Sequence, residues 1–182
     1  MSTVKKSRKG VVLRLEAEEA ALVRALMEQL LELLGSEEKD GGDAPDELAS
    51  MGIAENAEKS DDPVLARLFP DAYREDGEAA GEFRRYTEMG LRDGKREAAE
   101  TVLGVLDGVT SGGLNAVLDP GQAQAWLKSL NDVRLALGTR LDITEEWYEE
   151  AEGLDPRDPR TAMFAAYDWL TMLQESLVRA VW

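Results

Sequence analysis

The sequence predicts a mostly α-helical, single-domain bundle with a small two-stranded β element. The chain has 182 residues, a length that suits one domain around one hydrophobic core. Apolar residues recur at helical spacing through most segments, and two of these segments open with a capping residue followed by proline. Only residues 11–15 and 114–119 show the short, alternating or β-branched pattern that is typical of strands.

The first ten residues are basic and carry little apolar material, so we interpret residues 1–10 as a flexible basic tail. Residues 11–182 are then the helical domain, which opens with the strand VVLRL at 11–15. A helix follows over residues 16–35, with glutamates at its start, apolar residues at helical spacing and Gly35 as its stop. The acidic, glycine-containing segment at about 36–60 predicts a mobile loop.

The middle of the chain predicts three helices. A short one begins where Ser60, Asp61 or Asp62 can cap and Pro63 fits the first helical position, and it ends at Pro70. The following stretch to Gly108 predicts two helices, with a break near Met89-Gly90 or Asp93-Gly94.

The last third predicts a strand and three more helices. The strand at 114–119 should pair with the strand at 11–15, because a single strand cannot satisfy its own backbone hydrogen bonds. Asp119 and Pro120 then start a helix that runs to about Gly138. A short helix from Thr144 to Glu152, capped by Thr144, and a final helix from about Pro159 to the C-terminus complete the domain.

The composition excludes several classes of function. The chain has no cysteine and no histidine, which removes thiol catalysis, disulfides, thiolate zinc sites and serine–histidine or cysteine–histidine machinery. Its net charge of −16 disfavours nucleic-acid binding unless a basic patch is set apart on the surface. No apolar run is long enough to cross a membrane, and acids interrupt the segment where a signal peptide needs apolar residues. We therefore expect a cytoplasmic protein that does not bind membranes.

Two clusters of charge are candidate sites. The acids between Glu145 and Glu152 could hold a divalent cation, but a solvated acidic face is favoured because no calcium-loop spacing or histidine accompanies them. The basic residues between Arg84 and Arg96 could contact phosphate, but pairing with acids inside the protein is favoured. The sequence thus predicts no catalytic, cofactor-binding or metal-binding residue, and no cofactor.

The helix that contains WLKSLNDVRLALGTRLDI has polar side chains beside a predicted buried stripe of Trp126, Leu130, Val133 and Leu137. We interpret the polar residues as structural anchors, and an arginine in such a place commonly pairs with a carboxylate of another element. The predicted anchors are Asn131, Arg134 and Arg140. The predicted partner contacts are Arg84, Arg85, Trp169, Gln174 and Glu175, and Trp169 and Trp182 are expected to be partly exposed.

Long stretches of the chain resemble an actinobacterial family described as a domain of unknown function. They include EEAALVRALMEQLLELLG, SDDPVLARLFPDAYREDGEAAGEFRRYTE, LRDGKREAAETVLGVLD, LDPGQAQAWLKSLNDVRLALGTRLDITEE and YDWLTMLQESLV. The family is often encoded beside the protease adaptor ClpS and is similar to the AosR oxidative-stress regulators. In those regulators a cysteine pair is thought to form a redox switch, which cannot operate in this chain because it has no cysteine.

The resemblance implies a non-enzymatic cytoplasmic regulator of transcription or of the stress response. Such a regulator would act by contact with a protein, possible partners being a sigma factor or RNA polymerase. One alternative is direct DNA binding through the basic tail and the Arg84–Arg96 region, so contact with nucleic acid stays open. A second alternative is an accessory factor linked to ClpS-dependent proteolysis, and a homodimer is also left open.

Overall fold

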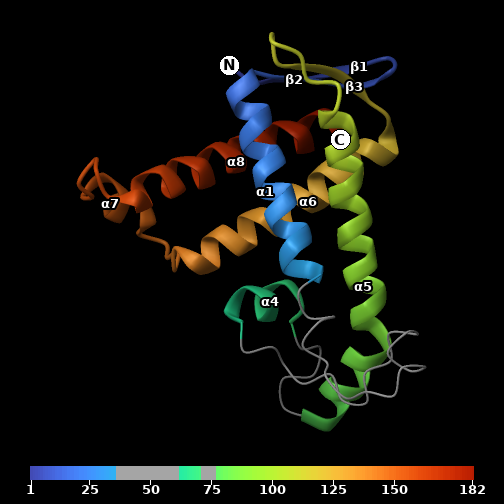
Figure 1. Ribbon diagram of the computed structural model, residues 1–182, viewed down its shortest axis with the longest axis vertical. Coiled ribbons are helices and arrows are strands. Elements are labelled where there is room, and N and C mark those ends of the chain that lie inside the picture. Colours follow the sequence, from blue (N-terminus) through green and yellow to red (C-terminus); the bar gives the residue numbers. More distant parts are fainter. Residues whose placement is uncertain (36–61, 71–76) are drawn as a thin grey trace.

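The computed structural model, shown in Figure 1, describes residues 1–35, 62–70 and 77–182. The predicted acidic loop at about 36–60 lies outside these residues. The elements, in chain order, are β1 (Thr3–Ser7), β2 (Gly10–Leu15), α1 (Ala17–Gly35), α4 (Pro63–Leu68), α5 (Gly77–Leu106), β3 (Leu114–Leu118), α6 (Pro120–Arg140), α7 (Trp147–Glu152) and α8 (Pro159–Val181). The mostly helical fold class is confirmed. No helix in the described part of the chain is long and apolar enough to span a bilayer.

The β element is an antiparallel sheet of three strands rather than two, in the order β1-β2-β3. The predicted pairing of the two recognised strands is confirmed, because Val11 lies opposite Leu118 and Leu15 opposite Leu114. The prediction of a flexible tail is wrong for residues 3–7, which form β1 against β2. The physical reason is that β1 satisfies the second edge of β2, while its lysines suit an outer strand that must not pair further.

Two glycines allow the strands of the sheet to pair closely. Gly10 follows the β1–β2 turn with φ +136°, and Gly113 precedes β3 with φ +91°. A Cβ atom on Gly10 would lie 2.1 Å from the carbonyl oxygen of Leu118, and one on Gly113 would lie 2.1 Å from that of Leu15. Both the left-handed backbone and the close approach of the neighbouring strand therefore require glycine at these positions.

The sheet covers one end of the helical body (Figure 1) and has two different faces. The inner face is apolar and joins the core, with Val11, Leu13, Leu15, Leu114 and Leu118 all buried. The alternate positions of β2 and β3 point outward, as strand geometry requires, and there Arg14, Asn115 and Val117 are exposed.

The predicted break in the middle of the chain is wrong, because α5 is one continuous helix from Gly77 to Leu106. Gly90 and Gly94 lie inside it, and a Cβ atom on either would have open space around it. Glycine costs only about 1 kcal/mol relative to alanine inside a helix. The burial of Ala99, Val102 and Leu106 against α1 and α6 supplies the stabilisation that offsets this cost.

α6 is the central helix, and its start and buried stripe are as predicted. Asp119 accepts a hydrogen bond from the backbone N–H of Gln122 while the Gln122 side chain accepts one from the backbone of Asp119, which completes a capping box. The stripe of Trp126, Leu130, Val133 and Leu137 is buried. The helix does not stop at Gly138, however, and continues to Arg140.

The end of α6 is set by Asp142 rather than by glycine. Asp142 adopts φ +51°, its N–H bonds to the carbonyl of Thr139, and the N–H of Ile143 bonds to the carbonyl of Gly138. These two hydrogen bonds form a Schellman motif. Gly138 instead lies inside the helix, where a Cβ would sit 3.4 Å from the Tyr167 ring and 3.7 Å from Ile143. This glycine therefore marks a close helix contact and not the end of the helix.

Residues 138–172 form a projection from the body, which we call the arm (Figure 1). It comprises the end of α6, the short helix α7 and the first part of α8. α7 begins at Trp147 and not at Thr144, because the Thr144 hydroxyl accepts a hydrogen bond from the N–H of Glu146 in the preceding turn. α7 has no fully buried residue, so it depends on contacts with α8 for its place.

Candidate functional site

Arg134 joins α6 to α8 at the base of the arm. Its Nε donates a hydrogen bond to Thr171 Oγ1 at 3.0 Å, and Nη1 donates to Gln174 Oε1 at 2.7 Å. Its guanidinium lies 5.4 Å from the centre of the Tyr167 ring. The structure thus places Arg134 as a clamp between two helices, with neutral partners in place of the expected carboxylate. Gln174, which was expected at a partner surface, accepts this hydrogen bond from Arg134 within the protein.

The other two predicted anchors lie at the surface. Asn131 is exposed, and its side chain makes no hydrogen bond to any part of the chain that the structure describes. Arg140 is exposed at the rim of a shallow apolar groove between α1 and α6, which includes Leu26, Leu33 and Ala136. Within the described part of the chain, Asn131 and Arg140 therefore make no clamping contact like that of Arg134.

Asp132, which the sequence did not single out as an anchor, forms a buried ion pair. It is 3% exposed, and its Oδ1 lies 2.7 Å from Nζ of Lys95 on α5. Burial raises the pKa of Asp132 above its usual value, although the hydrogen bond and the charge of Lys95 act in the opposite direction. The pair therefore links α5 to α6, at a cost in desolvation that only the partner offsets.

Arg92 lies one helical turn before Lys95 and is also buried. It donates a hydrogen bond to the backbone carbonyl of Leu34 at the end of α1 and pairs with Glu88 at 3.3 Å. The Arg92 guanidinium and the Lys95 ammonium lie 5.0 and 5.8 Å from the centre of the Phe69 ring. Arg92, Lys95, Ala99 and Val102 follow one another at steps of three, four and three residues, and this helical spacing is the signal in the sequence that both cations face the core.

These contacts account for only part of the basic region that was expected at Arg84–Arg96. Arg92 and Lys95 serve inside the protein, as the preferred interpretation anticipated. Arg84 and Arg85 belong to α5, but their side chains lie outside the described residues. The middle of α5 therefore offers fewer free cations to a phosphate than the sequence suggested.

Trp169, a predicted partner contact, joins three elements within the protein. It is half-buried, and its Nε1 donates a hydrogen bond to Glu19 Oε1 at 3.2 Å. The same carboxylate accepts from the backbone N–H of Ser2, next to β1, and from that of Glu16 before α1. Trp182 is 84% exposed. Glu175 is exposed on α8 and pairs with Arg179 one turn later.

The two ends of the molecule carry opposite charge. Residues 1–15, which include β1 and β2, hold no acid and are rich in cations: Lys5, Lys6, Arg8, Lys9 and Arg14. The arm carries exposed acids on α7 and just before it, among them Glu145, Glu149 and Glu150. In the described ranges no three acidic side chains come close enough together to hold a metal ion, so the cluster at Glu145–Glu152 forms no such site.

Comparison with known proteins covers almost the whole chain. A family model described as "Domain of unknown function (DUF2017)" matches residues 1–181. The chain is 36% identical over 175 residues to the "Oxidative stress regulator AosR" of Mycobacterium tuberculosis strain H37Rv, which covers 88% of this chain and 77% of that protein. It is 36% identical over 178 residues to the "Putative oxidative stress regulator AosR" of Mycobacterium leprae, covering 90% and 78%. No solved structure matches the chain.

Proposed function

The chain belongs to the DUF2017 family, and from this membership we propose that it is a non-enzymatic regulator of the oxidative-stress response that acts by contact with another protein. The observation that carries the proposal is the 36% identity, over 88% of the chain, to proteins named oxidative stress regulators. An identity of this size along almost the full length supports a shared role more strongly than a short motif would.

The finer part of the proposal concerns the partner. A sigma factor or RNA polymerase is the partner that the family resemblance favours, and transcription is the process that such a contact would change. The charge of this chain supports a protein partner, because a net charge of −16 repels nucleic acid over most of the surface while it favours contact with a basic protein face. Since the chain has no cysteine, its response to oxidants uses no thiol of its own.

Deletion of the gene in its native organism tests the proposal. We expect the transcripts induced by peroxide to change in the deletion strain, and the full chain supplied in trans to restore them. An unchanged transcript profile at every peroxide dose would contradict a role in the stress response. A profile that is restored equally by the chain and by an unrelated acidic protein would contradict a specific contact.

Direct contact with nucleic acid is the second candidate, and it is favoured by the charge of the sheet. The outer face there presents Lys5 and Arg14 with no acid on any of the three strands. A gel-shift titration at moderate salt would test it with the Lys5→Glu/Arg14→Glu double variant. The matched control is Lys128→Glu/Arg157→Glu, which changes the net charge equally at two exposed positions elsewhere. Equal affinity of both variants would remove this candidate.

A further inference from the structure

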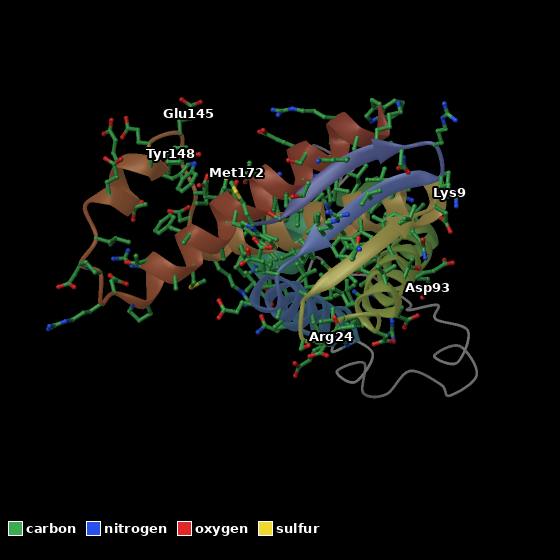
Figure 2. The ribbon with its side chains drawn as sticks, turned by 90° about the horizontal axis from the view of Figure 1, so that it is seen from above. Lys9, Arg24, Asp93, Glu145, Tyr148 and Met172 are labelled. Atoms are coloured by element: carbon green, nitrogen blue, oxygen red, sulfur yellow. The ribbon has the colours of Figure 1, made fainter. Side chains whose placement is uncertain are left out.

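The arm presents two large apolar side chains to solvent on one face. Tyr148 on α7 is 56% exposed and Met172 on α8 is 53% exposed. Figure 2 shows both along the same side of the molecule, with Glu145 beyond Tyr148. Asp168, Met172 and Glu175 follow one another at four and three residues on α8, so they share one face of that helix. Tyr148 reaches the same face, because its hydroxyl donates a hydrogen bond to Asp168 Oδ1 at 2.9 Å.

Tyr148 is held in place by an aromatic cluster beneath it. Its ring stacks on Trp147 with centroids 3.7 Å apart, and Trp147 lies 5.9 Å from Phe164 and 5.4 Å, edge to face, from Tyr167. Phe164 is buried, which anchors the cluster to α8. An exposed tyrosine fixed in this way loses little conformational freedom on binding, and tyrosine and methionine are both enriched at protein interfaces.

Carboxylates surround this apolar pair. The hydrogen bond to Asp168 raises the pKa of Tyr148, and the negative charges of Asp168 and Glu175 add to that effect, so both carboxylates act on the ring. Arg179 follows Glu175 by one turn of α8 and pairs with it at 3.3 Å, at the far end of the face. The electrostatic complement of such a face is a basic surface with an apolar side chain at its centre.

We propose that this face, made of Tyr148, Asp168, Met172 and Glu175, binds a basic segment of a partner protein, with an apolar side chain packed between Tyr148 and Met172. The proposal rests on the proposed function, since it states which surface of the regulator makes the contact and which chemical character the partner has. A second copy that docks through this same face is a poor occupant, because it would bring the same carboxylates against these. Nucleic acid is repelled for the same reason.

A synthetic peptide of leucine and lysine at helical spacing serves as the probe, and the same peptide with glutamate in place of lysine is its control. Titration of the full chain followed by NMR should show shifts concentrated on α7 and on α8 around Met172. The lysine peptide should bind and the glutamate peptide should not. Shifts that are spread evenly over the acidic surface, or centred on another element, would overturn the proposal.

Two variants with matched controls separate this face from general charge attraction. Met172→Gln keeps a long, helix-favouring side chain and should weaken binding about tenfold, whereas Val117→Gln on the sheet should not. Glu175→Lys should weaken binding more than Glu100→Lys, which makes the same change in net charge at an exposed position of α5. Equal losses for Glu175→Lys and Glu100→Lys, or an unaffected Met172→Gln, would each contradict the proposal.

The same variant distinguishes failure of this proposal from failure of the proposed function. If the wild-type chain restores the peroxide response of the deletion strain and Met172→Gln restores it equally, the face is wrong and the regulatory function stands. If the deletion changes no transcript, the function is wrong, while peptide binding at this face is still decided by the NMR titration.

Discussion

The sheet end and the arm differ in what holds them together and in the charge they show. The sheet is fixed by backbone pairing, by two glycines that no other residue can replace without strain, and by an inner face that joins the core. The arm is fixed by side chains: an aromatic cluster, the Arg134 clamp and a helix end closed by Asp142. The sheet shows cations, and the arm shows acids around an exposed apolar pair. The sheet should therefore tolerate substitutions of its surface side chains and be destabilised by substitutions of its glycines. The arm should tolerate a glycine substitution and be destabilised by loss of the side chains that hold it.

The sharpest way to break this comparison is to place the same substitution in both regions. Gly113→Ala puts a Cβ atom 2.1 Å from the carbonyl oxygen of Leu15 at a backbone φ of +91°, so β2 and β3 must separate locally. We expect a loss of about 3 kcal/mol in the free energy of unfolding, from strain and lost pairing together. A thermal melt should show a fall of roughly 6–12 °C for a domain of this size.

Gly138→Ala in the arm is the matched control. Its Cβ atom would meet the Tyr167 ring at 3.4 Å and Ile143 at 3.7 Å, which the side chains can accommodate. Alanine also favours the helix by about 1 kcal/mol over glycine. We therefore expect a change within about 1 kcal/mol of zero. Equal destabilisation by the two alanines would show that the regions are not held differently.

A comparison of Asp132→Ala with Arg134→Ala comes next in size, because the two residues tie α6 to different neighbours. Asp132→Ala leaves the Lys95 ammonium without its partner at a largely buried position, and we expect a loss of about 3 kcal/mol. Arg134→Ala removes two hydrogen bonds at 3.0 and 2.7 Å to partly buried neutral groups, for which about 1–2 kcal/mol is reasonable.

Denaturant unfolding measures both losses, and hydrogen exchange shows where they act. Asp132→Ala should lower protection in α5 and α6 together, whereas Arg134→Ala should lower it mainly in the arm. A larger loss for Arg134→Ala than for Asp132→Ala would reverse our ranking of the two contacts. Unchanged stability of Arg134→Ala, with weakened binding of the basic peptide, would instead place Arg134 in the functional surface.

Local signals in the sequence were sufficient for most helix starts. Asp62 with Pro63 and Asp119 with Pro120 act through neighbouring residues, so their effect can be read from the sequence itself. The pairing of β2 with β3 followed from the need of each strand for a partner. β1 was missed because its lysines suggest a solvated tail, although they suit an outer strand equally well.

Contacts between distant residues account for what the sequence did not predict. Lys95 and Asp132 are 37 positions apart, so the helical spacing that turns Lys95 towards the core does not identify Asp132 as its partner. The continuity of α5 through Gly90 and Gly94 depends on packing against α1 and α6, which local propensity cannot express. Tyr148 and Met172 come from helices whose arrangement only the fold decides, so their shared face could not be predicted from either segment alone.

The dependence of stability on pH offers a finer test of the ion pair in the body. The pKa of Asp132 is raised in the folded protein, so the folded state binds this proton more tightly than the unfolded state does. The contribution of Asp132 to stability should therefore increase as the pH falls from neutral towards its ordinary pKa, and decrease as the pH rises through the raised value. The measurement is the difference in unfolding free energy between the wild type and Asp132→Asn across pH 4–7.

Asp132→Asn removes the titrating carboxyl group but keeps the shape of the side chain and an acceptor for Lys95. The titration of the other acids is nearly the same in both proteins, so it largely cancels in the difference in unfolding free energy. The unfolding free energy of the wild type should rise relative to that of the variant as the solution is acidified. A wild type that loses relative to Asp132→Asn on acidification would mean that the attraction of Lys95 outweighs burial.

The smallest effect that we predict is at the end of α6, where the arm begins. Asp142 holds φ +51°, a conformation that costs an aspartate energy and that glycine adopts freely. Asp142→Gly should therefore stabilise the protein, but only by about 0.5 kcal/mol, because glycine also gains freedom in the unfolded chain. The two hydrogen bonds of the Schellman motif involve only backbone atoms and survive the change. Thermal melts of Asp142→Gly and Asp142→Ala form the test, with alanine expected to destabilise. If both variants lower the melting temperature equally, then the Asp142 side chain itself supports the arm, and the left-handed backbone is not what limits its stability.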